Sequence, residues 1–181
     1  MRHTTNFFMT ILLLCFTQCK DPIKVNKTAQ ESTYDKGQVT FYGAYYAADG
    51  IEQNVVSLDI YSKDLSLDSA GYMVGTGVNL YISDIFLPQQ DTMLVESSYI
   101  MDTTGRAFTF IPGVNFDGTI SGAYILTVTD GSLVNTEIFE DGSFQVGYKG
   151  DSVLIEFLLK KESGEKYAAY FKGELPYYDG R

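Results

Sequence analysis

Two cysteines lie close together near the N-terminus of a chain that contains no other cysteine. They are Cys15 and Cys19, in the stretch ILLLCFTQCKDP. A pair of thiols could form a disulfide, hold a metal ion or take a covalent modification. The single histidine of the chain, His3, also lies in this terminal region. All thiolate and imidazole chemistry is therefore confined to one short segment.

The segment that holds these cysteines has the pattern of an export signal. A short polar start, with Arg2 and His3, precedes an almost purely apolar run at 7–16. Such a run is too short to span a membrane and is typical of the apolar region of a signal peptide. No small-residue cleavage site of the usual secretory type follows it.

The residues after the apolar run are similar to the lipobox of bacterial lipoproteins. In that family a peptidase cleaves before a cysteine, which is then acylated. The family prefers Leu and a small residue at the places held here by Phe16 and Gln18. Cys15 fits the pattern less well, because Leu14 stands directly before it. The resemblance implies a signal peptide at 1–18 and lipid attachment at Cys19.

Cleavage before Cys19 would remove most of the familiar catalytic chemistry. His3 and Cys15 would both be lost, and Cys19 would be acylated. Histidine-based triads, imidazole metal sites and disulfides would then be absent. Carboxylate, tyrosine, lysine and hydroxyl chemistry would remain. We therefore expect no cofactor, no metal site and no enzyme activity.

Two carboxylates stand out because each lies inside an apolar run that predicts a strand. These are Asp59 and Glu156. A pair of acids could hydrolyse a glycoside if the carboxyl groups faced each other about 5–10 Å apart. The simpler interpretation places both on the solvent-facing side of half-buried strands.

Tyrosine is the most frequent aromatic residue, with 14 copies against 12 Phe and no Trp. Its flat apolar ring and polar tip suit binding surfaces as well as cores. The candidate ligand contacts are Tyr42, Tyr46 and Tyr81. Strand alternation places Tyr42 and Tyr46 on one face and Tyr45 on the other.

Strand and turn patterns fill the rest of the chain, and no stretch has a strong helical period. Asp-Gly pairs between alternating apolar runs are a strong signal for hairpins. About nine strands are predicted, at 39–47, 54–62, 77–86, 107–112, 121–129, 133–140, 143–148, 153–160 and 166–173.

These strands predict one all-β domain at 38–181, behind a polar tether at 19–37. A long antiparallel meander can protect its edges by closing on itself. We therefore favour a lipocalin-like, calycin-like barrel over a two-sheet sandwich. A wide cavity in that barrel would favour a carrier, whereas a filled interior would leave only surface functions.

Five pieces of the chain form a recurring aromatic and turn pattern: FYGAYYA, VVSLDIYS, GTGVNLYISDIF, FIPGVNFDGTISGAYI and YFKGEL. Over 38–178 this pattern resembles an uncharacterised family of small Bacteroidetes lipoprotein domains. Lys20-Asp21 after Cys19 is also similar to the start of the export signal of surface lipoproteins in that phylum. The resemblance implies an all-β fold anchored in the outer membrane, on its periplasmic or cell-surface side, and no activity.

Asp followed by Ser or Thr is similar to the O-glycosylation acceptor of exported proteins in the same phylum. Such pairs are equally good turn formers. They occur at 68–69, 91–92, 102–103 and 151–152.

The net charge of −10 limits the partners. An acidic chain repels the phosphates of nucleic acids, so no nucleic acid partner is expected. Contact with the membrane is expected through the lipid anchor. The expected function is non-enzymatic binding or an accessory role at the envelope, with a small molecule, a glycan or a protein as ligand. The alternatives are a structural protein of a surface assembly and a carboxylate-based glycoside hydrolase.

Overall fold

The computed structural model describes residues 33–181 and is all-β apart from one short 3-10 helix. The expected signal peptide at 1–18, Cys19 and residues 20–32 lie outside the described part. The elements are β1 (Lys36–Gly43), η1 (Ala47–Asp49), β2 (Asn54–Tyr61), β3 (Leu65–Leu67), β4 (Met73–Gly75), β5 (Gly77–Leu87), β6 (Ser98–Met101), β7 (Thr109–Phe110), β8 (Val114–Phe116), β9 (Thr119–Ser121), β10 (Ala123–Thr129), β11 (Ser132–Lys149), β12 (Ser152–Lys161), β13 (Lys166–Gly173) and β14 (Tyr177–Asp179). The all-β expectation is confirmed, but the chain forms more strands than the nine predicted.

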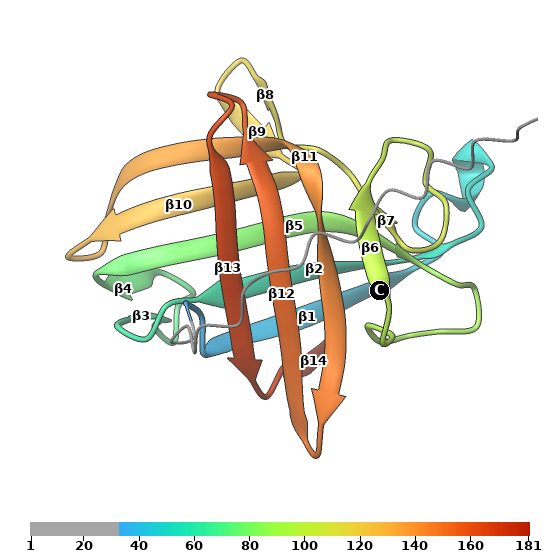
Figure 1. The fold of residues 1–181 in the computed structure, drawn as a ribbon, viewed down its shortest axis with the longest axis horizontal. Helices are drawn as coiled ribbons and strands as arrows, with labels where there is room; N and C mark the ends of the chain where they lie inside the picture. Colours follow the sequence, from blue (N-terminus) through green and yellow to red (C-terminus); the bar gives the residue numbers. More distant parts are fainter. Residues whose placement is uncertain (1–32) are drawn as a thin grey trace, which may run out of the picture.

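One ten-stranded sheet folds over to make two layers (Figure 1). The back layer contains β14, β1, β2, β5 and β10, with the first half of β11 at its far edge. The front layer contains the second half of β11 with β12 and β13, which cross the back strands steeply. Within 33–181, no helix is long and apolar enough to cross a membrane.

The long strands pair in chain order, and each pair is antiparallel. The pairs are β1–β2, β2–β5, β5–β10, β10–β11, β11–β12 and β12–β13. Short strands β6 and β7 connect β11 back to β5, so β5, β10, β11, β6 and β7 make a small closed barrel. On the opposite side, Tyr34 bridges to Phe171 of β13 and is fully buried. The fold therefore includes residues from the end of the expected tether.

Strand β11 carries the chain from the back layer to the front layer. A turn was predicted at Asp141-Gly142, but the strand continues through it as a β-bulge, where the register with β12 shifts. Gly142 has a φ of 140°, and a Cβ there would lie 2.7 Å from the Leu159 Cα. The Asp117-Gly118 and Asp130-Gly131 pairs do form hairpin turns, with positive φ at both residues.

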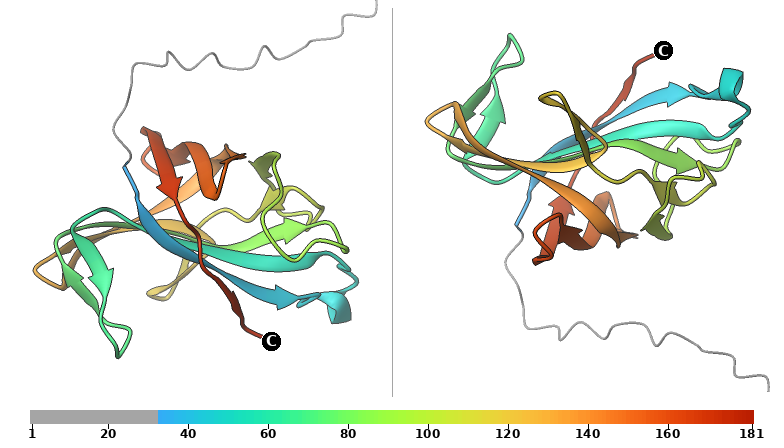
Figure 2. Two further views of the ribbon diagram at one scale, coloured as in Figure 1. Left: turned by 90° about the horizontal axis from the view of Figure 1, so that it is seen from below. Right: turned by 90° about the horizontal axis from the view of Figure 1, so that it is seen from above.

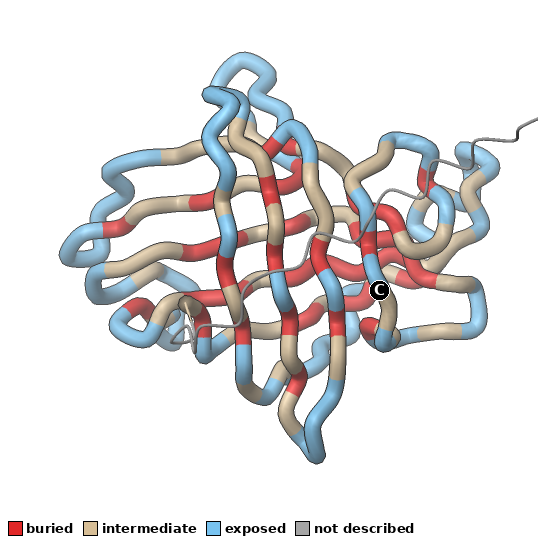
Figure 3. The backbone as a smooth tube through the Cα atoms, viewed as in Figure 1, coloured by how far each residue is buried: buried red, intermediate tan, exposed pale blue. Residues whose placement is uncertain are grey.

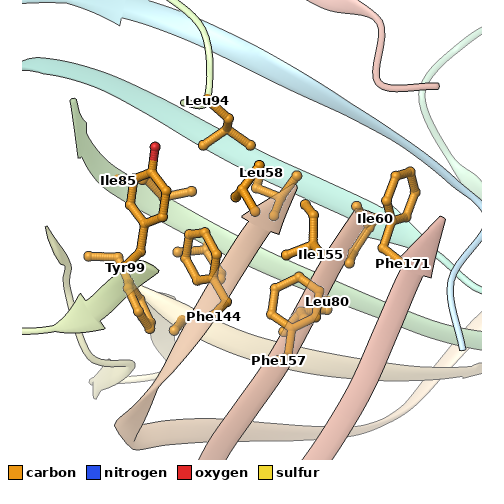
Figure 4. Packing of buried hydrophobic residues seen from close by; sticks show 14 of the residues in the cluster. Leu58, Ile60, Leu80, Ile85, Leu94, Tyr99, Phe144, Ile155, Phe157 and Phe171 are labelled. Carbon is orange, nitrogen blue, oxygen red and sulfur yellow. The ribbon is translucent and has the colours of Figure 1, made fainter. Parts of the chain in front are cut away.

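The residues of both layers that face each other are buried (Figure 3), and their side chains fill the space between the layers (Figure 4). Leu58 and Ile60 of β2 belong to the same buried cluster as Phe157 of β12. The ring of Phe144 stacks on Tyr99 at 4.7 Å and lies 5.6 Å from Phe157 between ring centroids. Side chains of the two layers therefore occupy the space between them.

A small apolar cavity lies at one end of this core. Its volume is about 20 Å³, close to that of a single water molecule. Its lining includes Val39, Leu94, Tyr148 and Val153. A cavity of this size has no room for the ligand of a carrier.

Candidate functional site

The outward face of the back layer carries polar and aromatic side chains. On β2, Leu58 and Ile60 point into the core, so Ser57, Asp59 and Tyr61 point outward. The same alternation turns Asn79 and Tyr81 of β5 and Tyr124 of β10 away from the core. Three neighbouring strands thus contribute to one face.

The strand register aligns three of these side chains, Asp59, Tyr81 and Tyr124, in a row with Gln38 of β1. Gln38 of β1 lies opposite Asp59, Asp59 lies opposite Tyr81, and Tyr81 lies opposite Tyr124. Residues paired across antiparallel strands project from the same face. Asp59 is therefore flanked by Gln38 on one side and by Tyr81 on the other.

The Asp59 carboxylate is held by two neutral donors. The Tyr61 hydroxyl donates to Oδ2, and the Asn79 Nδ2 donates to Oδ1 at 2.6 Å. The same Asn79 amide also donates to the Ile60 carbonyl at 3.1 Å, which fixes its orientation. Among the described residues, no lysine or arginine pairs with Asp59.

Burial raises the pKa of the Asp59 carboxyl, although the hydrogen bonds from Tyr61 and Asn79 oppose the rise. Burial and the bond to Asp59 also raise the pKa of Tyr61. A half-buried carboxylate with only neutral partners is under-compensated, which is a property typical of binding sites. A ligand that donated a hydrogen bond here would relieve that cost.

Two tyrosine rings lie beside the carboxylate. The centroids of Tyr81 and Tyr124 are 5.2 Å apart. Burial raises the pKa of Tyr81 to about 12, with a further rise from Tyr42 and a decrease from a hydrogen bond with Ser57. Burial likewise raises the pKa of Tyr124. The phenols are therefore neutral near pH 7 and offer both apolar faces and hydroxyl groups.

The turn after β1 extends this aromatic surface. Gly43 ends the strand with a φ of 66°, so strand alternation stops before Tyr45 and Tyr46. The ring of Tyr45 meets Tyr42 edge-on at 6.2 Å and Tyr46 at 5.0 Å. The prediction that Tyr45 lies on the opposite face was wrong, because the chain turns where a strand was expected.

Tyr46 is fixed at the far end of this surface. Its hydroxyl donates to Asp84 Oδ1 at 2.9 Å, and the Ser83 hydroxyl donates to Oδ2 of the same carboxylate at 2.7 Å. Burial, followed by the bond to Asp84, raises the pKa of Tyr46 to about 12. Its ring also packs beside Phe86, at 6.0 Å.

We call this set the tyrosine face. It consists of Asp59, Tyr42, Tyr45, Tyr46, Tyr81 and Tyr124. Two hairpins, β3–β4 and β8–β9, project on the same side of the back layer, away from β12 and β13 (Figure 2). The β3–β4 hairpin covers one end of the back layer, where Leu65 and Met73 pack on Tyr61 and Val128.

The three tyrosines expected to contact a ligand all belong to this face. Sequence reasoning missed Tyr61, Asn79 and Tyr124, which hold or flank Asp59. Their signal was present as the alternating polar positions of two strands, Ser57-Asp59-Tyr61 and Asn79-Tyr81. Only the pairing of β2 with β5 brings these positions together.

The other carboxylates serve different roles. Glu156 is exposed on β12, in agreement with the simpler interpretation of the sequence. Asp68 accepts hydrogen bonds from the backbone of Ala70 and Tyr72, as expected of a turn former. Asp102 does the same with Thr104. Among the described residues, no group of three or more His, Cys, Asp and Glu side chains could hold a metal ion.

Comparison of the chain with protein-family models, with curated proteins and with solved structures finds no match. The functional inference therefore depends on the geometry of the tyrosine face.

Proposed function

We propose that this protein is a non-enzymatic binding lipoprotein of the bacterial envelope. Acylated Cys19 would anchor it in the outer membrane, on the periplasmic or cell-surface side. The tyrosine face would bind a neutral, hydroxyl-rich ligand, and a glycan is the chemical class that suits it best. The lipobox resemblance and the acidic, histidine-poor chain support this assignment.

The observation that carries the proposal is the under-compensated Asp59 beside two tyrosine rings. A carboxylate offers about four acceptor positions, and Tyr61 and Asn79 occupy two of them. Sugar hydroxyls could donate to the remaining positions while an apolar sugar face packed on Tyr81 or Tyr124. The net charge of −10 disfavours anionic ligands.

The filled interior supports a surface site. Large aromatic side chains occupy the space between the layers, and the apolar cavity holds only about 20 Å³. A carrier needs a pocket of roughly 300 Å³ or more for a small ligand. We infer a calycin-like meander from the antiparallel pairing in chain order, but one whose binding site lies outside the barrel.

The alternatives have unequal support. The hydrolase has less support, because no second carboxylate is among the causes that shift the pKa of Asp59. The Asp84 carboxylate, at the far end of the tyrosine face, accepts hydrogen bonds from Tyr46 and Ser83. A role in surface assembly is favoured by the first half of β11, whose outer edge pairs with no strand of the described residues 33–181. That role is compatible with glycan binding by the tyrosine face.

The test is binding of the full chain to arrays of neutral oligosaccharides and of their sulfated or uronic-acid counterparts. We expect binding to neutral glycans, and about fivefold weaker binding in Tyr81→Ala, since one aromatic contact contributes about 1 kcal/mol. Asp59→Asn should weaken the same interaction.

The matched control is Tyr72→Ala, which removes an exposed tyrosine from the loop between β3 and β4. It should bind like the wild-type protein. Absence of binding to any neutral glycan would contradict the proposal, and so would equal losses in Tyr72→Ala and Tyr81→Ala.

A further inference from the structure

The first half of β11 forms an open edge of the back layer. Residues 132–138 pair with β10 on one side. Pairing with β12 begins only at Phe139, and pairing with β6 begins at Ser143. Within the part of the chain that the structure describes, no strand pairs with the outer side of residues 132–137. Their outward backbone groups are available to another strand.

This edge carries only part of the protection of natural edge strands, namely the charge of Glu137 and a β-bulge beside Val134. Its sequence, SLVNTE, contains no lysine and no proline. The side chains of Leu133 and Val134 are 60% and 58% exposed. A register shift beside Val134 leaves Asn135–Ile138 as the regular part of the ladder. The edge of β13, in contrast, begins with the exposed Lys166 and is bridged by Tyr34.

A polar cleft of about 240 Å³ adjoins the regular part of the edge. Its walls come from β11, from the β8–β9 hairpin and from the end of β12 with the turn that follows. The lining residues are Asn115, Ile120, Thr136, Glu137, Ile138, Lys161, Glu162 and Ser163. An added strand on β11 would lead directly into this cleft.

The charges of the cleft favour a basic group. The Lys161 ammonium is already paired with Glu137 at 3.1 Å and with Glu165 at 2.9 Å. The exposed Glu162 adds a carboxylate to the lining. The whole chain has a net charge of −10, so its long-range electrostatic field also attracts a positively charged group.

We propose that the outer edge of β11 is a strand-addition site for an extended segment of a partner protein. The segment pairs its backbone with residues 132–137 and places a basic side chain in the polar cleft. Main-chain hydrogen bonds supply affinity in this mode of recognition, and the cleft supplies specificity. The site shares no residue with the tyrosine face, but it adjoins that face, because Ile138 of the cleft lies opposite Tyr124. Strand addition does not depend on glycan binding.

A slender segment suits this edge better than a second copy of the chain. A stable interface between folded proteins buries about 1,200 Å² or more, which a short edge cannot supply alone. The β8–β9 hairpin and the β12–β13 turn stand beside residues 136–138 of β11 and restrict access by a bulky partner (Figure 1). Two copies, each with a net charge of −10, would also repel each other.

The test is selection of a phage library of random peptides, about eight residues long, on the purified full chain. Val134→Lys places a charge on the edge, and Val74→Lys makes the same change at a similarly exposed valine of β4. We expect β-branched peptides with a basic residue to be enriched on the wild-type protein and on Val74→Lys. Val134→Lys should bind the selected peptides at least tenfold more weakly.

Hydrogen exchange with a selected peptide gives the second readout. Protection should appear in residues 132–137 and be lost when proline replaces a central residue of the peptide. Three results would overturn the proposal: no enrichment, protection confined to β13 or β14, or light scattering that shows a dimer of the chain broken by Val134→Lys.

Discussion

At the residue scale, Asp59 combines a structural cost with the binding role that we propose for it. Its carboxylate sits on a sheet face where burial raises its pKa, and its two hydrogen-bond donors are neutral. Replacing such a group with a neutral one of the same shape often increases stability. We therefore expect a neutral residue at position 59 to raise the stability of the fold and to weaken ligand binding.

Asp59→Asn tests the expected gain in stability through pH. The folded-state pKa lies above the unfolded value of about 3.9, so the contribution of Asp59 to stability is complete below that pH. It is lost as the pH rises through the folded-state pKa. Asp59→Asn should therefore be more stable than the wild type at pH 7, by about 1.4 kcal/mol for each unit of pKa difference. Urea unfolding near pH 3 should give a smaller difference, and an equal difference at both pH values would contradict the assignment.

Tyr61→Phe makes the complementary change, because it removes a hydrogen bond that lowers the pKa of Asp59. The variant should lose about 1.5 kcal/mol of unfolding free energy at pH 7 and less near pH 3. The double variant with Asp59→Asn is the control, and there the dependence on pH should disappear. A loss that persists in the double variant with the same pH dependence would assign the effect to other contacts of Tyr61.

At the scale of elements, local turn chemistry predicted some connections and failed at others. Asp130-Gly131 forms the hairpin turn that its sequence indicates. Asp141-Gly142 has the same two residues, yet β12 pairs across it and converts the turn into a bulge within β11. Whether an Asp-Gly pair forms a turn or continues a strand therefore depends on pairing with a distant strand such as β12, which the local sequence does not reveal.

The same limit applies to the candidate site. Alternation along β2 and β5 predicts that Asp59 and Tyr81 face away from the core, but only the register between the strands makes them neighbours. Tyr45 was misplaced because Gly43 adopts a positive φ and ends the strand early. The short strands β3, β4, β6, β8 and β9 have too few residues for a period to be recognised.

Two glycines of β11 give a matched test of the bulge. A Cβ at Gly142 would lie against the backbone of Leu158 and Leu159, whereas a Cβ at Gly147 would meet nothing within 4 Å. Gly142→Ala should therefore lower the free energy of unfolding by about 1–3 kcal/mol, and Gly147→Ala should change it by less than about 1 kcal/mol. Thermal unfolding measures both, and equal effects would contradict the bulge geometry.

At the scale of the whole molecule, the filled interior leaves the proposed ligand a site only on the surface. Phe157 is almost fully buried in the core, and Leu158, its neighbour on β12, points outward. Phe157→Ala should lower the free energy of unfolding by about 3–5 kcal/mol through cavity formation. Leu158→Ala should lower it by about 1 kcal/mol. Comparable losses in denaturant unfolding would mean that the two faces of β12 are equally packed.

The proposed lipid anchor at Cys19 would set the position of the molecule in the cell. Cys19→Ala should abolish incorporation of a labelled fatty acid during growth, whereas Cys15→Ala should leave it unchanged. Labelling that persisted in Cys19→Ala would refute the lipobox assignment. Glycan binding by the tyrosine face would be unaffected by that result.

The most direct test of the central claim is an NMR titration of the full chain with a neutral oligosaccharide that binds on the array. We expect the changes in amide chemical shift to concentrate at the outward positions of β2, β5 and β10, around Asp59, Tyr81 and Tyr124. Shifts concentrated instead around the small apolar cavity, at Leu94 and Val153, or on the front layer would contradict that claim.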